Sequence, residues 1–376
     1  MKIRAIVLVI LLVAAFTATA QQETPPDYFL GVDLSYVNEM EDCGAVYRVD
    51  GEPHDPYEIF HDAGANLVRL RLWHAPDWTD YSTLEDVTRS MERAKALGMA
   101  VLLDFHYSDT WADPGKQIIP AAWEDLDDAA LGAALYEYTY DVLMQLDAQG
   151  LMPELVQVGN EINSEILRAE GTSGTPIHWE RNAALINQGI RAVRDAGAAG
   201  SSAPRVMLHI AKPESVEGWL RSAVRAGVTD FDVIGISYYP GWSSHSIRTI
   251  DNIVKSLRER FEKDVMIVET SYPWTLRGAN ESAGNILGDD FLDPDYPATP
   301  EGQRQFMIDL TQAVLNGGGT GVIYWEPGWV STPCETLWGT GSHWENATVF
   351  DFTNDNAVHA GIEWLGYPYT LPDEAP

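Results

Sequence analysis

Short apolar runs alternate with amphipathic segments along the chain from residue 29 onward. The apolar runs have the length and β-branched content of buried strands, whereas the segments between them repeat apolar residues at helical spacing. About eight strand–helix alternations follow without a linker, which is the pattern of a single (β/α)8 TIM barrel of the α/β class. The predicted strands are 29–35, 66–73, 99–107, 155–161, 205–210, 231–239, 265–272 and 321–327, and the predicted helices are 57–63, 83–97, 126–149, 179–196, 215–226, 247–262 and 302–315, with a short helix near 357–365.

The first twenty residues have a different pattern, which is typical of a signal peptide. A positive start with Lys2 and Arg4 is followed by an apolar run over 6–16 and by an A-x-A cleavage signal that ends at Ala20. The run is too short for a membrane helix. We therefore expect cleavage after Ala20 and export to the extracellular space or the periplasm, which leaves 21–376 as one barrel domain.

The charge of the chain limits its partners. With 24 basic and 56 acidic residues, the formal net charge is −32. Such a surface repels polyanions, which argues against nucleic acid and anionic membranes as partners and is compatible with a neutral polymer. The 13 Trp and 16 Tyr can stack on sugar rings but are also ordinary core residues. We expect a monomer.

The chain has two cysteines, Cys43 and Cys334. They fall in the predicted loops after the first and last strands, and these loops are neighbours in a closed barrel. One cysteine pair in an exported chain makes a disulfide plausible. We expect a bridge between the two, with two free thiols as the alternative.

Two of the predicted strands end at a glutamate. The run that starts at Leu155 stops before Asn160 and Glu161, and the run that starts at Val265 stops at Glu269. In chain order these are the ends of the fourth and seventh strands, and all carboxyl ends of barrel strands lie on one face. A single Glu of this kind is more simply a helix cap. Two of them on one face are the equipment for breaking a glycosidic bond, at roughly 5–5.5 Å apart in retaining enzymes.

Further candidates lie at the same strand ends. The amide of Asn160 can bond a sugar hydroxyl. Arg71 either lowers the pKa of Glu269, the expected nucleophile, or pairs with another barrel carboxylate. Trp325 is either the floor under the reacting sugar or a core residue. The loop after the third strand adds three candidates for hydroxyl and ring contacts, of which a lone histidine would more often be structural: His106, Asp109 and Trp111.

Five stretches together resemble the endo-β-1,4-galactanases of glycoside hydrolase family fifty-three. The longest and most specific is the third-strand motif LDFHYSDTWADPGKQ, and the resemblance covers essentially the whole mature chain. It implies a retaining endo-hydrolase of β-1,4-galactan, the side chains of type I arabinogalactan and pectin. The stretches are 68–73, 103–117, 156–163, 237–240 and 267–272.

The resemblance also implies roles for single residues. Glu161 would be the acid/base and Glu269 the nucleophile of a double displacement. Asn160 and Trp325 would lie at the subsite of the cleaved bond. Further substrate contacts are expected from Asp109, Trp111, Lys212 and Tyr238.

Some bacterial members of that family hold a calcium ion in a loop after the seventh strand. The matching region here, 278–285, is poor in the carboxylates that a hard cation prefers. The region therefore fits a structural calcium ion poorly without excluding one, and we expect no metal ligand and no required cofactor.

The sequence leaves two alternatives open. A related retaining barrel that acts on β-mannan or β-glucan would carry the same pair of glutamates. A non-catalytic galactan-binding protein would keep the fold, but the presence of Glu161, Glu269 and Asn160 speaks against lost catalysis.

Overall fold

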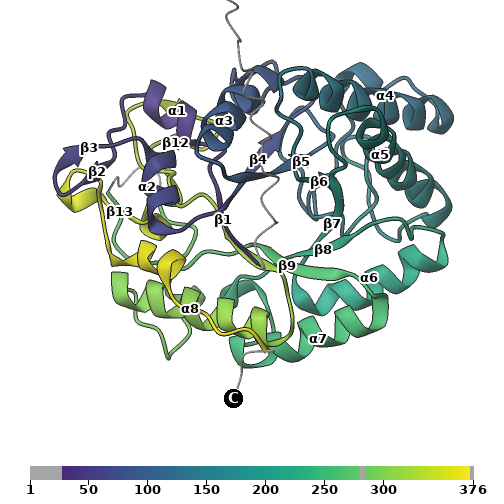
Figure 1. Ribbon diagram of the computed structural model, residues 1–376. Coiled ribbons are helices and arrows are strands. Elements are labelled where there is room, and N and C mark those ends of the chain that lie inside the picture. Colours follow the sequence, from purple (N-terminus) through teal and green to yellow (C-terminus); the bar gives the residue numbers. More distant parts are fainter. Residues whose placement is uncertain (1–27, 280–283, 373–376) are drawn as a thin grey trace, which may run out of the picture.

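The computed structural model describes residues 28–279 and 284–372, in which eight parallel strands close into a barrel (Figure 1). Each barrel strand pairs with the barrel strands before and after it in the chain, and β1 pairs with β10 to close the ring. The predicted (β/α)8 barrel is confirmed. Its strands are β1 (Phe29–Asp33), β4 (Leu67–Leu72), β5 (Ala100–Phe105), β6 (Leu155–Val158), β7 (Arg205–Ala211), β8 (Val233–Ser237), β9 (Asp264–Glu269) and β10 (Gly321–Tyr324).

Helices cover the outside of the barrel (Figure 1). Several begin at a side chain that accepts a hydrogen bond from an otherwise unpaired amide of the first turn, namely Asp55, Thr83, Asp127 and Thr299. These capping residues explain why the helices start where the sequence pattern places them. The helices are α1 (Val37–Asp42), α2 (Pro56–Ala63), α3 (Leu84–Ala96), α4 (Asp128–Asp147), α5 (Trp179–Ala199), α6 (Pro213–Arg225), α7 (Ile250–Phe261) and α8 (Pro300–Asn316).

Two predicted helices differ in the structure. The region 247–262 divides into a 3-10 turn, η3 (Ile247–Thr249), and α7. The region 357–365 is not one helix, because its first residues form β14 (Ala357–Val358), which pairs with β13 and β2, before η7 (Ala360–Gly366) begins. The other 3-10 turns are η1 (Ala121–Trp123), η2 (Pro240–Trp242), η4 (Asp289–Phe291), η5 (Glu345–Ala347) and η6 (Phe352–Asn354).

The chain after β10 folds back against the segment after β1. A four-stranded sheet joins the two, and a disulfide between Cys43 and Cys334, with Cα atoms 5.8 Å apart, links them covalently. The expected bridge is therefore confirmed. The small sheet holds β2 (Arg48–Val49), β3 (Glu52–Pro53), β13 (Phe350–Asp351) and β14, and a separate hairpin holds β11 (Glu335–Thr336) and β12 (Gly339–Thr340).

The amino-terminal half of the barrel interior is filled by apolar side chains. They form a cluster separate from the larger core between the strands and the helices. Every barrel strand contributes to it, so the lower half of the barrel is a packed plug rather than a channel. The cluster consists of Phe29, Leu67, Leu102, Leu155, Met207, Val233, Met266, Val268 and Ile323.

Arg69 on β4 is the centre of a charged network in the barrel. Its side chain is 1% exposed and lies 2.8 Å from Asp33, 2.8 Å from Asp104 and 2.9 Å from Glu269. It also donates a hydrogen bond of 2.8 Å to Asn160. Burial lowers the pKa of Arg69, but the surrounding carboxylates outweigh this effect and hold the pKa above its ordinary value. The guanidinium therefore stays charged and ties β1, β4, β5 and β9 together.

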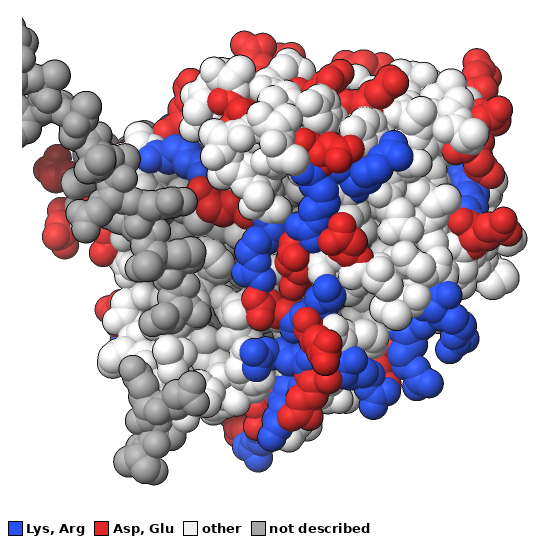
Figure 2. Space-filling view, turned by 45° about the vertical axis from the view of Figure 1, so that its right-hand side comes forward, with Lys and Arg blue, Asp and Glu red and all other residues white. Residues whose placement is uncertain are grey.

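The outer surface is acidic, but its charges are mixed. Figure 2 shows a face on which Lys and Arg lie among Asp and Glu. Surface pairs such as Arg260 with Glu217 and Arg194 with Asp230 are examples of this mixing. The predicted signal peptide, 1–20, lies outside the described residues. None of the helices within them has the length and apolar character needed to cross a membrane.

We expect Arg69→Met to lower the free energy of unfolding by about 3–5 kcal/mol, because it leaves buried carboxylates without their cation. The matched control is Arg89→Met, whose partner Asp42 and own side chain are 44% and 47% exposed and whose loss should lower it by at most about 1 kcal/mol. Denaturant unfolding followed by tryptophan fluorescence measures both. Equal effects of the two substitutions would contradict the role given to Arg69.

Candidate active site

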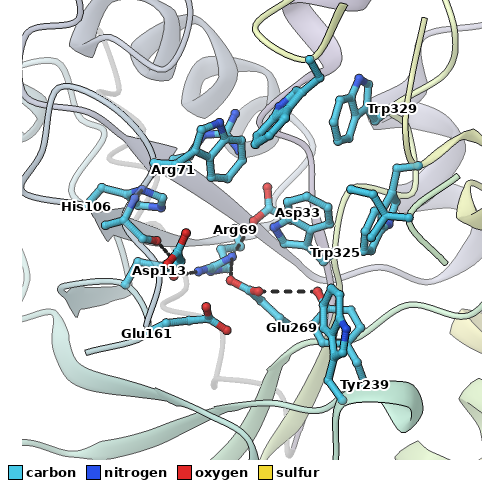
Figure 3. Close-up of a pocket in the computed structure, with 17 residues that line it drawn as sticks. Asp33, Arg69, Arg71, His106, Asp113, Glu161, Tyr239, Glu269, Trp325 and Trp329 are labelled. Carbon is cyan, nitrogen blue, oxygen red and sulfur yellow. Dashed lines mark hydrogen bonds and ion pairs between the residues drawn. The ribbon is translucent and has the colours of Figure 1, made fainter. Parts of the chain in front are cut away.

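A cavity of about 230 Å³ opens at the carboxyl ends of the barrel strands (Figure 3). Segments after β5, β6, β8, β9 and β10, together with residues of β1, β4 and β9, supply its walls. Charged side chains and tryptophans both line it, as a site for a polar ligand with flat apolar faces requires. The lining consists of Asp33, Arg69, Arg71, His106, Trp111, Ala112, Asp113, Asn160, Glu161, Tyr239, Trp242, Glu269, Ile286, Trp325, Trp329, Trp338 and Trp344.

Glu161 lies in a tight turn just beyond β6. Gly159 has a φ of +84° and Glu161 a φ of +45°. For a residue other than glycine, this left-handed backbone conformation costs about 1 kcal/mol or more. The hydroxyl of Ser237 donates a 2.6 Å hydrogen bond to its Oε1. Burial raises the pKa of Glu161 to about 7, and the hydrogen bond from Ser237 opposes this shift.

Glu269 is the last residue of β9 and is 7% exposed. Its Oε1 lies 2.9 Å from Nη1 of Arg69, and the hydroxyl of Tyr239 donates a long, 3.5 Å hydrogen bond to its Oε2. Burial raises the pKa of Glu269, the positive charge of Arg69 lowers it, and the negative charge of Glu161 raises it again. The two carboxyl groups therefore influence each other across one cavity (Figure 3).

The surroundings of the two carboxyl groups favour the state in which one is protonated and the other is ionised. Both are buried, and mutual repulsion opposes the state in which both are ionised. Arg69 forms an ion pair with Glu269 but not with Glu161. We therefore assign the negative charge to Glu269 and the proton to Glu161. One ionised and one protonated carboxyl group in the same cavity can serve as nucleophile and proton donor.

Of the two interpretations of Arg71, the ion pair with another carboxylate is the one observed. Arg71 lines the cavity, but its carboxylate partner is Glu326, 3.3 Å away, and not Glu269. Its guanidinium also lies over the ring of Trp111, 4.1 Å from the centroid. Residues 69 and 71 are two apart on β4 and face the same side, so the strand pattern alone does not tell which of them reaches Glu269. That residue is Arg69.

Asn160, His106, Trp111 and Trp325 line the cavity, as the sequence suggested. Asn160 is also used within the protein, because its oxygen accepts from Arg69 and its amide donates to the carbonyl of Ala112 at 2.7 Å. The ring of His106 is likewise held, with Nε2 3.1 Å from Asp104. These contacts fix the two polar side chains in the wall.

Three other candidates do not line the cavity. Asp109 accepts hydrogen bonds from the backbone amides of Ala75 and Ala121 and so holds two loops together. The hydroxyl of Tyr238 donates to the carbonyl of His245, and the next residue, Tyr239, faces the cavity instead. Lys212 is exposed just before α6. Neighbouring residues of an extended chain point to opposite sides, which explains the exchange between the two tyrosines.

Several lining residues were not anticipated from the sequence. Asp33 and Arg69 had a usable signal, because charged residues inside otherwise apolar strands are seldom unpaired. The tryptophans after β10 had no sequence signal apart from the high tryptophan count, because only the folding back of the chain brings them to the cavity. The calcium-loop region 278–285 lies partly outside the described residues. The unanticipated residues are Asp33, Arg69, Ala112, Asp113, Tyr239, Trp242, Ile286, Trp329, Trp338 and Trp344.

Comparisons with known proteins agree with this architecture. The chain is 52% identical over 359 residues to an arabinogalactan endo-beta-1,4-galactanase of Cellvibrio japonicus, with 95% of each chain covered. It is 34% identical to an endo-beta-1,4-galactanase of Bacillus subtilis, over 90% of this chain and 80% of the relative. The solved GH53 catalytic domain of Ignisphaera aggregans superposes with a TM-score of 0.83 at 32% identity, over 93% of this chain and 98% of that one. The family model for glycosyl hydrolase family 53 matches residues 29–362, and the chain belongs to that family.

Proposed function

We propose that this glycoside hydrolase cleaves β-1,4-galactosidic bonds within galactan, the neutral side chain of type I arabinogalactan and pectin. The observation that carries the proposal is the 52% identity, over nearly the whole length, to a relative named as an arabinogalactan endo-beta-1,4-galactanase. The cavity supports it independently, because it combines two buried glutamates with a wall of tryptophans.

The mechanism that follows is a double displacement with retention. The carboxylate of Glu269, charged beside Arg69, attacks the anomeric carbon while the carboxyl group of Glu161 gives its proton to the departing oxygen. Glu161 is then ionised and removes a proton from water, which attacks the same carbon and releases Glu269. Each group is suited to its role, because the cation stabilises the carboxylate of Glu269, and burial keeps a proton on Glu161.

The tryptophans supply the apolar part of sugar recognition. The ring of Trp325 lies next to two others: its centroid is 4.6 Å from that of Trp344 and 6.2 Å from that of Trp111. Flat rings in the wall of the cavity suit the apolar face of a pyranose ring, and the charged and amide side chains of the wall suit its hydroxyls. Related barrels for β-mannan or β-glucan would share these features, so the axial 4-hydroxyl of galactose has to be tested directly.

Export and a neutral partner are part of the same proposal. The A-x-A signal at Ala20 and the bridge between Cys43 and Cys334 both suit a protein that acts outside the cytoplasm. The acidic surface suits an uncharged substrate and not nucleic acid or an anionic membrane. The amino-terminal sequence of the exported chain tests the cleavage site: a start at Gln21 is expected, and a start at Met1 would contradict it.

The substrate and the two glutamates can be tested together. Linear galactan should yield short β-1,4-galacto-oligosaccharides, whereas β-mannan and β-glucan should not. Glu161→Gln should lower kcat/KM on galactan by about 10²–10⁴-fold, and Glu269→Gln by at least as much, because they remove the proton donor and the nucleophile. Reducing-end release and product chromatography measure both.

A buried glutamate outside the cavity provides the control. Glu165 is 6% exposed and lies beside His178, so Glu165→Gln should leave activity on galactan near that of the wild type. Galactan binding without release of reducing ends by the wild type would instead indicate a binding protein. Preferred hydrolysis of mannan or glucan would reassign the substrate.

The pH dependence follows from the state of Glu161. Its pKa is raised to about 7, and it must be protonated to assist the departing sugar. Activity should therefore be present below that pKa and kcat/KM should fall as the pH rises through it, by about tenfold per pH unit. Initial rates at low galactan concentration across the pH range measure this. A decline that is complete at a pH well below 7 would contradict the assignment of the proton donor.

A further inference from the structure

A chain of buried hydrogen bonds leads away from Glu161, on the side opposite the cavity. The hydroxyl of Ser237 at the end of β8 lies 2.6 Å from Oε1 of Glu161 and 2.7 Å from Nε2 of His209 on β7. Neither Ser237 nor His209 lines the cavity, and His209 is fully buried. Hydrogen bonds of this length between buried polar groups have a definite direction, which the neighbouring donors determine.

The direction is fixed at the other ring nitrogen of His209. The backbone amide of Glu161, which can only donate, lies 3.4 Å from Nδ1, and the amide nitrogen of Gln157 lies 3.1 Å from it. Gln157 is oriented by its neighbours, because its nitrogen donates to Asp104 at 2.5 Å and its oxygen faces Nε of Arg69 at 3.4 Å. Two donors therefore point at Nδ1, which must carry a lone pair.

The oxygen of Asn160 also lies near this nitrogen, at 3.0 Å. It already accepts a charge-assisted hydrogen bond from Arg69, at 2.8 Å, so it does not need a proton from His209. Burial and the positive charge of Arg69 hold the pKa of His209 well below its ordinary value, so the ring is neutral. Its single proton is then on Nε2 and is donated to Ser237.

We propose that Ser237 and His209 are positioning residues for proton transfer: His209 donates to Ser237, Ser237 donates to Oε1 of Glu161, and Oε2 is thereby left as the oxygen that carries and transfers the proton. This inference rests on the proposed function and specifies the atom that acts in it. Because Oε1 accepts in both protonation states, the carboxyl group keeps one orientation when it acts as acid and later as base.

Other groups around Glu161 act through charge. The negative charges of Asp113 from the loop after β5, Asp104 from β5 and Glu269 from β9 disfavour its ionisation. The positive charge of Arg69 from β4 favours it. The buried phenol of Tyr239 after β8 is neutral, since burial raises its pKa. Ser237 differs from these groups because it contacts the carboxyl group directly, so its removal changes both the orientation of Glu161 and the hydrogen bonding of its charged form.

The test compares two substrates and the pH profile. Ser237→Ala should move the alkaline limb of kcat/KM upward by about one pH unit, because the lost hydrogen bond had favoured the carboxylate. On galactan, kcat/KM should fall by roughly 10- to 100-fold through loss of orientation. A galacto-oligosaccharide with a 2,4-dinitrophenyl leaving group needs no protonation in the first step, so its kcat/KM should change by less than about threefold.

Matched variants separate positioning from general damage. Ser237→Thr keeps the hydroxyl group, so its alkaline limb should lie at the wild-type pH. Ser222→Ala, on the exposed face of α6, should change neither the limb nor kcat/KM. His209→Gln keeps an amide that can donate, so its limb should lie between those of the wild type and Ser237→Ala. Thermal unfolding confirms that each variant is folded. If Ser237→Ala is too unstable to assay, Ser237→Cys, a weaker donor, should shift the limb in the same direction.

An unshifted limb together with equal losses on both substrates would overturn the proposal. That outcome is distinct from failure of the proposed function. In the latter case the wild type itself releases no reducing ends from galactan. An active wild type with an unchanged profile in Ser237→Ala rejects only the role of the hydrogen-bond chain.

Discussion

The guanidinium of Arg69, buried among carboxylates, is the interaction on which the rest of the structure depends. Taking a cation and its partners out of water is expensive unless every group finds a partner, and here Asp33, Asp104, Glu269 and Asn160 all contact the same side chain. These partners come from four different segments of the barrel. The same cation that joins the strands therefore also sets the charge of the group we propose as nucleophile.

The two proposed catalytic carboxyl groups share a cavity but not an environment. Glu269 lies against the cation, whereas the direct donor to Glu161 is a hydroxyl group, and burial raises the pKa of Glu161 to about 7. Two like groups with unequal surroundings are the usual basis for dividing nucleophile and acid between identical side chains. Arg69 pairs with Asp104, which orients Gln157. Gln157 in turn helps to set the direction of the hydrogen bonds that run from His209 through Ser237 to Glu161.

The far end of the chain completes the site. The segment after β10 contributes Trp329, Trp338 and Trp344 to the cavity wall and is linked to the segment after β1 by the disulfide at Cys43 and Cys334. The barrel thus supplies the charges, and an irregular segment supplies much of the apolar wall. This division is common in enzymes of this fold, where loops vary on a constant scaffold.

The sequence by itself determined the barrel and the two glutamates, because strand and helix periodicity is local and the carboxyl ends of parallel strands must share a face. It also indicated the disulfide, since loops after the first and last strands of a closed barrel are neighbours. Only the tertiary structure decided that Arg69 rather than Arg71 meets Glu269, that Tyr239 replaces Tyr238, and that distant tryptophans close the cavity. Periodicity tells which way a side chain points, but its height in the barrel and the reach of a loop depend on strand register, tilt and packing.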